Sequence, residues 1–136
     1  GLFSNAGELF AICQMLLDQG EYQGQRYLKA ETIKEFNKRH FEKHNNRRGL
    51  GFDKPLISSP SNHCSKYSSQ ESFGHSGFTG TYFWIEPQNN TIFIFLSNRE
   101  YPDAKTNKLA QMNIRTDIQD LIYESLKMNL EKNESK

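Results

Sequence analysis

The sequence has few cysteines, no excess of charge of either sign and no long apolar run. Its two cysteines, Cys13 and Cys64, are widely spaced and suggest no disulfide framework, so we expect free thiols. Lys and Arg number 17 against 16 for Asp and Glu, and a net charge of +1 gives no argument for nucleic acid as a partner. No segment approaches membrane-spanning length, and no signal-like segment opens the chain.

The apolar residues that are present gather in segments, as in a folded domain. They make up only 35% of the chain and are separated by long polar loops. A chain of 136 residues can bury one real core and not two. Because it begins at Gly1 without methionine, directly before a predicted helix, we expect a fragment or a processed piece of a longer protein.

Helical periodicity marks both ends of the chain. Asn5 and Glu8 fit an N-cap with its capping-box partner, and apolar residues recur at helical spacing from there to Gly20. The last helix is predicted to lay an apolar stripe across one face of a sheet. The stripe consists of Ile114, Ile118, Leu121, Ile122 and Leu126. We expect residues 1–128 to form the domain and the charged residues 129–136 to be a disordered tail.

Shorter elements are predicted between these helices. Residues 21–28 favour a small hairpin, and residues 30–38 favour a second helix. Residues 37–48 are almost all polar and read as a solvated loop, followed by a short strand at 48–53, "RGLGFD". Residues 58–72, rich in Ser, Asn and Pro, predict a long irregular loop.

Two apolar runs predict the centre of the sheet. "TYFWIE" and "TIFIFLS" are separated by the turn residues 87–90, a pattern typical of a β-hairpin. The second run is apolar on both faces, so helices must cover the sheet on both sides. The predicted class is therefore α+β, with an antiparallel sheet of about three strands between the N-terminal and C-terminal helices.

The histidines could be considered as metal ligands. His40 and His44 are four residues apart and His63 adjoins Cys64, but neither pair has further ligands at a recognisable spacing. We therefore expect no metal and no cofactor. Apart from Phe41, the basic residues of 39–48 lack interleaved aromatic side chains and are better explained as a solvated face than as a nucleic-acid site.

The stretch "SFGHSGFTG" has an unusual density of glycine. Gly74, Gly77 and Gly80 would let a ligand approach the backbone, while His75 and Ser76 offer a titratable ring and a hydroxyl beside that bare edge. Such an edge can bind and polarise a carbonyl or carboxylate group. The alternative is a β-bulge whose glycines only relieve crowding, and composition alone favours that alternative.

Four stretches, taken in order, resemble one known superfamily. They are "GLFSNAGELFAICQMLLDQGEYQGQRYL", "ETIKEF", "RGLGFD" and "FGHSGFTGTYFWIEPQNNTIFIFLSNREYP", and they cover most of residues 1–102. In order and spacing they resemble the C-terminal part of serine β-lactamases and penicillin-binding proteins. The nearest likeness is to the branch of class C β-lactamases, D-Ala-D-Ala carboxypeptidases and esterases. The resemblance implies a partial β-lactamase/transpeptidase-like fold.

The resemblance also implies site residues. The family's third active-site motif, Lys or His, then Thr or Ser, then Gly, is matched by His75, Ser76 and Gly77. By resemblance, His75 belongs to the proton network of the nucleophile and Ser76 binds the substrate carboxylate. The backbone N–H of Phe78 is implied as an oxyanion donor, with Gly77 and Thr79 beside the substrate. Histidine in place of lysine leans toward peptidase or esterase activity.

The family's other two motifs are missing. No serine is followed three positions later by lysine, and neither Y-x-N nor S-x-N occurs. We therefore expect the chain to be inactive alone, as part of a serine hydrolase acting on β-lactams, D-Ala peptides or esters. The alternative is a non-catalytic, penicillin-recognising binding module.

Partners and location follow from the same resemblance. We expect a small-molecule or peptidoglycan-type substrate that binds together with the missing N-terminal segment, no nucleic acid and no membrane span. Strand edges left open by the missing segment are predicted to let the chain self-associate. The family's usual location implies the periplasm or the cell exterior.

Overall fold

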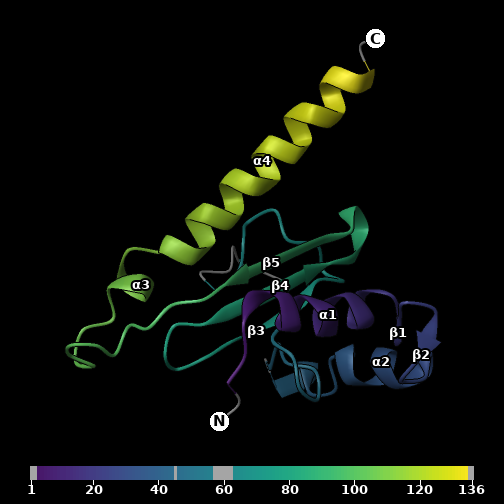
Figure 1. The fold of residues 1–136 in the computed structure, drawn as a ribbon, viewed down its shortest axis with the longest axis horizontal. Coiled ribbons are helices and arrows are strands. Elements are labelled where there is room, and N and C mark those ends of the chain that lie inside the picture. Colours follow the sequence, from purple (N-terminus) through teal and green to yellow (C-terminus); the bar gives the residue numbers. More distant parts are fainter. Residues whose placement is uncertain (1–2, 45, 57–62, 135–136) are drawn as a thin grey trace.

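The computed structural model describes residues 3–44, 46–56 and 63–134. Within these residues it contains four α-helices, a two-stranded sheet and a three-stranded antiparallel sheet (Figure 1). The α+β prediction is confirmed. The helices are α1 (Ala6–Leu17), α2 (Ala30–Asn37), α3 (Lys108–Gln111) and α4 (Ile114–Glu134). The small sheet pairs β1 (Glu21–Tyr22) with β2 (Gln25–Arg26), and the main sheet has the order β3 (Phe73–Ser76), β4 (Tyr82–Glu86), β5 (Thr91–Phe95).

The elements from α1 to α2 form where the local sequence predicts them. The Asn5 side chain accepts a hydrogen bond from the Glu8 N–H at 3.1 Å, as an N-cap does. The Glu8 carboxylate accepts from the Ser4 hydroxyl at 3.0 Å instead of closing a capping box. Gly20 follows the end of α1 with φ of +94°. Only glycine fits there, because a Cβ would lie 2.2 Å from the Leu28 carbonyl oxygen.

Both faces of the main sheet are covered, as the apolar β5 predicts. On one face Cys13 and Leu16 of α1 pack with Phe73 and Ile85 of the sheet. On the other face lies a cluster that includes a partly buried side chain of α4. Its members are Cys64, Tyr82, Trp84, Phe93, Phe95 and Ile122. Both cysteines are buried and neither forms a disulfide, and the pKa of Cys13 is raised to about 11 by burial.

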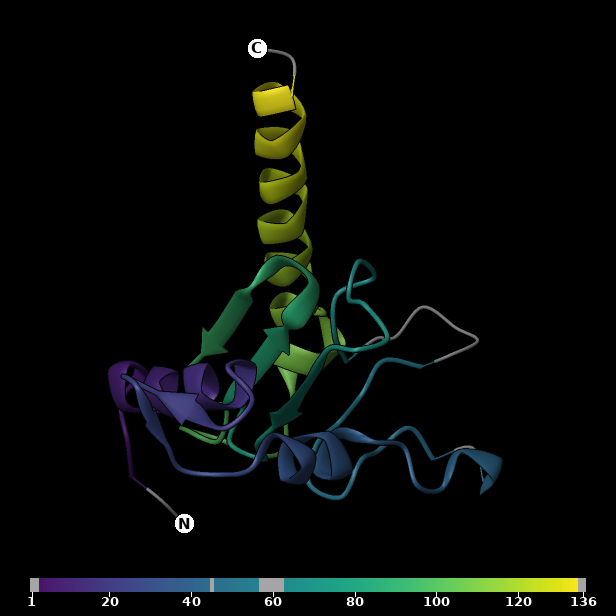
Figure 2. The same cartoon turned by 90° about the vertical axis from the view of Figure 1, so that its right-hand side faces the viewer.

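The face of α4 that meets the sheet differs from the predicted stripe. Ile118 and Leu121 are 37% and 62% exposed, whereas Gln119 and Tyr123 are buried. Gln119 Oε1 accepts hydrogen bonds from the Tyr82 hydroxyl and the Ser65 N–H, both at 3.0 Å. The helix is thus oriented by polar anchors, which a search for apolar periodicity misses. Figure 2 shows α4 rising away from the sheet.

A buried carboxylate joins α4 to the turn end of the sheet. Glu86 is 2% exposed and accepts from the Ser69 N–H at 2.8 Å, the Ser69 hydroxyl at 2.6 Å and the Gln88 N–H at 3.1 Å. The Tyr123 hydroxyl of α4 also donates to it at 3.1 Å. Burial, and then the Glu86 charge, raise the pKa of Tyr123, so the phenol remains a donor.

Three predicted segments can be compared with the structure. The strand predicted at 48–53 is wrong: only Asp53 pairs, in an isolated bridge to Gly74, and β3 is the third strand of the sheet. Within the predicted loop 58–72, residues 58–62 lie outside the described residues. The backbone stays helical to Glu134, inside the predicted tail, and residues 135 and 136 are not described. No helix of the described part is long and apolar enough to cross a membrane.

Glu86→Ala should lower the free energy of unfolding by about 3 kcal/mol, because it leaves several buried donors without an acceptor. Glu124→Ala is the matched control, since Glu124 also accepts from a tyrosine hydroxyl, that of Tyr67 at 2.9 Å, at an exposed site. It should change stability by less than about 0.5 kcal/mol. Urea denaturation of both variants measures the difference, and equal losses would contradict this account of the α4 anchor.

Candidate active site

The predicted site residues lie at the end of β3 and in the turn that follows. Pairing with β4 runs without interruption from Phe73 opposite Ile85 to Ser76 opposite Tyr82. The β-bulge interpretation is therefore wrong, because a bulge would place two residues of β3 opposite one of β4. After Ser76 the chain turns back at residues 77–80, where the Gly80 N–H donates to the Gly77 carbonyl at 3.0 Å.

The glycines of this stretch relieve crowding inside the protein. A Cβ on Gly74 would lie 2.1 Å from the Phe83 carbonyl oxygen of β4, and one on Gly77 would lie 2.3 Å from the Thr81 hydroxyl. Gly80 has φ of +100°, a conformation that other residues rarely adopt. The alternative was therefore right that these glycines relieve crowding. Evidence for an open strand edge must come from the hydrogen bonds and not from the glycines.

One residue pairs with the outer edge of β3. The Asp53 N–H donates to the Gly74 carbonyl at 2.8 Å, and the Gly74 N–H donates back to Asp53 at 3.1 Å. The Asp53 carboxylate is buried and forms ion pairs with Arg48 Nε at 2.7 Å and Arg47 Nη2 at 3.4 Å. The Arg47 and Arg48 side chains are 31% and 53% exposed, and beyond the predicted solvated face they also neutralise the buried carboxylate beside the site.

Beyond that bridge the edge is open. In an antiparallel strand, alternate residues direct their backbone groups to the same side, so Ser76 points its N–H and C=O outward as Gly74 does. No strand among the described residues pairs with Ser76 on that side. The Phe78 N–H likewise donates to no described residue. Unpaired N–H groups at an edge are what a developing oxyanion requires.

His75 and Ser76 lie on opposite faces of the sheet. Phe73 packs in the cluster on the α1 side, so strand alternation puts His75 on that face and Ser76 on the α4 side. Both side chains are partly buried. A ligand that reaches both must therefore lie along the outer edge of β3, beside Gly77 and Thr79, which are exposed.

Arg99 is a residue of this region that sequence reasoning missed. Its Nε donates to the Phe78 carbonyl, its guanidinium lies 4.3 Å from the centroid of the Phe78 ring, and its own N–H donates to the Thr79 carbonyl at 2.9 Å. The only sequence signal is a basic residue four positions after the end of β5. The contact joins segments 21 positions apart, so local patterns do not reveal it.

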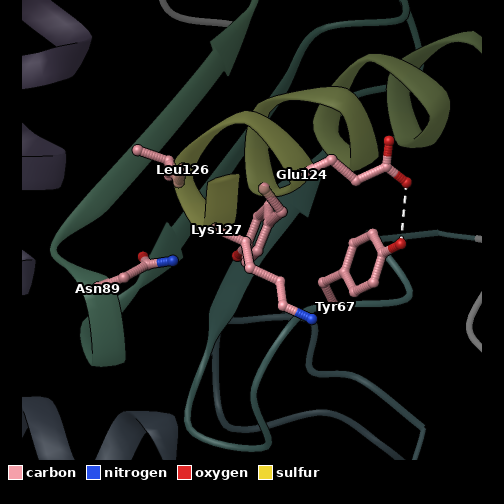
Figure 3. A pocket seen from close by; sticks show the side chains of 6 residues that line it. Tyr67, Asn89, Glu124, Leu126 and Lys127 are labelled. Carbon is pink, nitrogen blue, oxygen red and sulfur yellow. Dashed lines mark hydrogen bonds between the residues drawn. The ribbon is translucent and has the colours of Figure 1, made fainter. Parts of the chain in front are cut away.

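A separate hollow of about 210 Å³ lies where α4 passes the hairpin turn. It is lined by Tyr67, Asn89, Tyr123, Glu124, Leu126 and Lys127. Figure 3 shows Tyr67 beneath α4 with its hydroxyl directed at Glu124. Asn89 belongs to the turn after β4, whereas Ser76 is opposite the first residue of β4. The hollow and the predicted site therefore lie at opposite ends of that strand.

A second hollow, of about 480 Å³, contains a buried amine. Lys54 is 4% exposed, and its Nζ donates to Asn37 Oδ1 at 2.8 Å and to the Glu71 carbonyl at 3.2 Å. Burial, and then the charge of Arg39, lower the pKa of Lys54 to about 8. Across the described ranges, no three His, Cys, Asp or Glu side chains lie close enough together to hold a metal ion.

Comparison with known proteins identifies the family of this chain. The sequence model of the family described as Beta-lactamase matches residues 1–116. The chain is 32% identical over 113 residues to an Escherichia coli (strain K12) protein named "Putative D-alanyl-D-alanine carboxypeptidase", and 29% identical over 109 residues to a Salmonella gallinarum protein of the same name. These matches cover 82% and 80% of the chain but only 26% and 25% of the relatives.

The chain thus spans about a quarter of the length of the curated relatives it matches. The matched family region includes the whole main sheet and the stretch from His75 to Thr79. The predicted resemblance is confirmed. The chain belongs to the Beta-lactamase family, within the superfamily of serine β-lactamases and penicillin-binding proteins.

Proposed function

We propose that this chain forms one wall of the active site of a serine hydrolase that works through an acyl-enzyme. The observation that carries the proposal is the open outer edge of β3, which begins just after the Asp53 bridge. There the Phe78 N–H is free of described partners, in the turn that directly follows His75 and Ser76 of β3. Donors fixed at an edge can stabilise negative charge that develops on a carbonyl oxygen.

The proposed reaction divides the work between this chain and a segment outside it. A serine of that segment attacks the substrate carbonyl, and the resulting oxyanion is bound by the Phe78 N–H. Collapse of this intermediate expels the leaving amine or alcohol, which takes up a proton through a network that includes His75. Ser76 donates a hydrogen bond to the substrate carboxylate, with Gly77 and Thr79 lining the edge. Water then releases the acyl group.

The relatives' name favours a peptide ending in D-Ala-D-Ala as the substrate, with β-lactams and small esters as further candidates. Such a substrate carries the C-terminal carboxylate for which Ser76 is proposed. A D-Ala-D-Ala substrate also implies a cell-envelope enzyme, in the periplasm or at the cell exterior.

A second candidate function is a binding module that has lost its chemistry. It is favoured by one observation, the lack of an S-x-x-K serine and of its Y-x-N or S-x-N partner within the 136 residues. Under the hydrolase proposal both motifs lie in the part of the protein that corresponds to the remaining length of the relatives. The sequence encoded upstream of Gly1 distinguishes the two, since the hydrolase requires an intact S-x-x-K there.

His75→Ala in the full-length protein should lower kcat for a D-Ala-D-Ala peptide by on the order of a hundredfold, as expected for the loss of a proton-transfer contact. His40→Ala is the control, because His40 lies in the loop after α2, where its Nε2 is 3.4 Å from Glu35. That variant should retain its turnover. Steady-state kinetics of both variants test the assignment, and unchanged kcat in His75→Ala would return this histidine to a structural role.

The isolated 136-residue chain should hydrolyse neither the peptide nor a chromogenic β-lactam, because it contains no activated nucleophile. The measurement is absorbance-monitored hydrolysis against the full-length protein at equal concentration. Turnover by the chain alone that is lost in Ser76→Ala would show the proposed division of the site to be wrong. Turnover that survives in Ser76→Ala would instead point to a contaminating hydrolase.

The isolated chain should also self-associate through its strand edges. The outer edge of β5 pairs with no described strand, and that of β3 is bridged only at Gly74, so both offer unpaired backbone groups. Sedimentation velocity should therefore show a sedimentation coefficient that rises with concentration for the chain and stays constant for the full-length protein. A chain that stays monomeric up to about 100 μM would contradict this, since edge pairing is concentration-dependent.

A further inference from the structure

We infer that Arg99 is a positioning residue for the oxyanion donor, acting by clamping the turn that carries Phe78. This inference rests on the proposed function, in which the Phe78 N–H binds the oxyanion. It assigns a role to a residue that neither the motif match nor local sequence identifies.

The turn's own hydrogen bonds fix only its two ends. The Gly77 N–H donates to the Thr81 carbonyl at 2.7 Å, and the Gly77 carbonyl accepts from the Gly80 N–H at 3.0 Å. Because a peptide group is planar, the second bond also restrains the Phe78 N–H, which shares a plane with the Gly77 carbonyl. The next plane, at the Phe78 carbonyl, makes no hydrogen bond within the turn, whereas the Thr79 carbonyl shares its plane with the Gly80 N–H that donates to Gly77.

Arg99 supplies the missing bond at Phe78 and a second bond at Thr79. Its Nε donates to the Phe78 carbonyl, and its backbone N–H donates to the Thr79 carbonyl at 2.9 Å. The planes on both sides of the Phe78 Cα are then held, so the Phe78 backbone has little freedom to redirect its N–H. Since Arg99 lies beyond β5, this clamp ties the turn to the opposite edge of the sheet.

The Phe78 side chain is held by the same guanidinium. The ring is 74% exposed, so packing alone does not hold it, and the guanidinium carbon lies 4.3 Å from the ring centroid. Nη1 of Arg99 also donates to the Ala104 carbonyl at 3.3 Å, which fixes the far end of the side chain. A planar guanidinium can stack and donate at once, whereas a lysine ammonium can replace only part of this.

The test uses the full-length protein with Arg99→Ala and Arg99→Lys, and Arg26→Ala as the matched control. Arg26 also binds two backbone carbonyls, those of Gln19 at 2.9 Å and Leu28 at 3.1 Å, but in the β1–β2 hairpin. Arg99→Ala should lower kcat for a D-Ala-D-Ala peptide by on the order of tenfold, less than the loss of an oxyanion donor itself, with KM changed less than about twofold. Arg99→Lys should recover part of the loss, and Arg26→Ala should keep the wild-type kcat.

Several kinetic outcomes would overturn the inference. A rise in KM at constant kcat in Arg99→Ala would make Arg99 a substrate ligand and not a positioning residue. An equal fall in kcat in Arg26→Ala would show that any lost arginine clamp damages the enzyme. Equal kcat in Arg99→Ala and wild type would show that the turn holds its donor unaided.

Amide hydrogen exchange provides a readout that needs no activity. In Arg99→Ala the amides of Gly77 and Gly80 should exchange on the order of tenfold faster than in wild type, while Arg26→Ala leaves them unchanged. A wild-type protein that hydrolyses no tested substrate would contradict the proposed function, and exchange would still decide whether Arg99 holds the turn. Unchanged exchange in Arg99→Ala would overturn the clamp whatever the activity.

Discussion

The active-site edge depends on where strand pairing stops. Asp53 exchanges two backbone hydrogen bonds with Gly74, and the pairing does not continue into a longer ladder. The outer side of β3 is therefore covered up to Gly74 and open after it. The bridge is itself held by a buried carboxylate and two arginines. A longer pairing strand at 48–53 would have extended along β3 and occupied the backbone groups proposed for the substrate.

The two ends of the main sheet have different roles. At the hairpin-turn end, the buried Glu86 carboxylate accepts four hydrogen bonds, one of them from the Tyr123 hydroxyl of α4. At the other end, the turn after β3 keeps the Phe78 N–H without a described partner. An end anchored by hydrogen bonds thus supports an end with free donors, as expected of a scaffold that positions a site.

Sequence alone predicts the features of this fold that depend on local chemistry. Asn5 and Gly20 mark the ends of the first helical unit, and the turn residues of 87–90 mark the hairpin, because capping and turn geometry are local. Two features could not be predicted from the sequence. One is the face that α4 turns to the sheet, where Gln119 bonds to distant groups, and the other is the pairing at Asp53, beside which two arginines neutralise the carboxylate. Apolar periodicity carries no signal for either.

The candidate site divides in the same way. Ordered motifs identify His75 and Ser76 and imply a role for the Phe78 N–H, but they cannot show that the two side chains lie on opposite faces of the sheet. That placement confines a shared ligand to the strand edge. Arg99 was missed because its contacts cross the sheet between segments that no short motif spans.

The central claim is that this edge completes an acyl-enzyme site whose nucleophile lies elsewhere in the protein. The most direct test is intact-protein mass spectrometry of the full-length protein after incubation with a penicillin, followed by peptide mapping of the adduct. The account predicts one penicilloyl group on a serine outside these 136 residues, and this adduct should form more slowly in Ser76→Ala. No adduct, or an adduct on a residue of this chain, would contradict it.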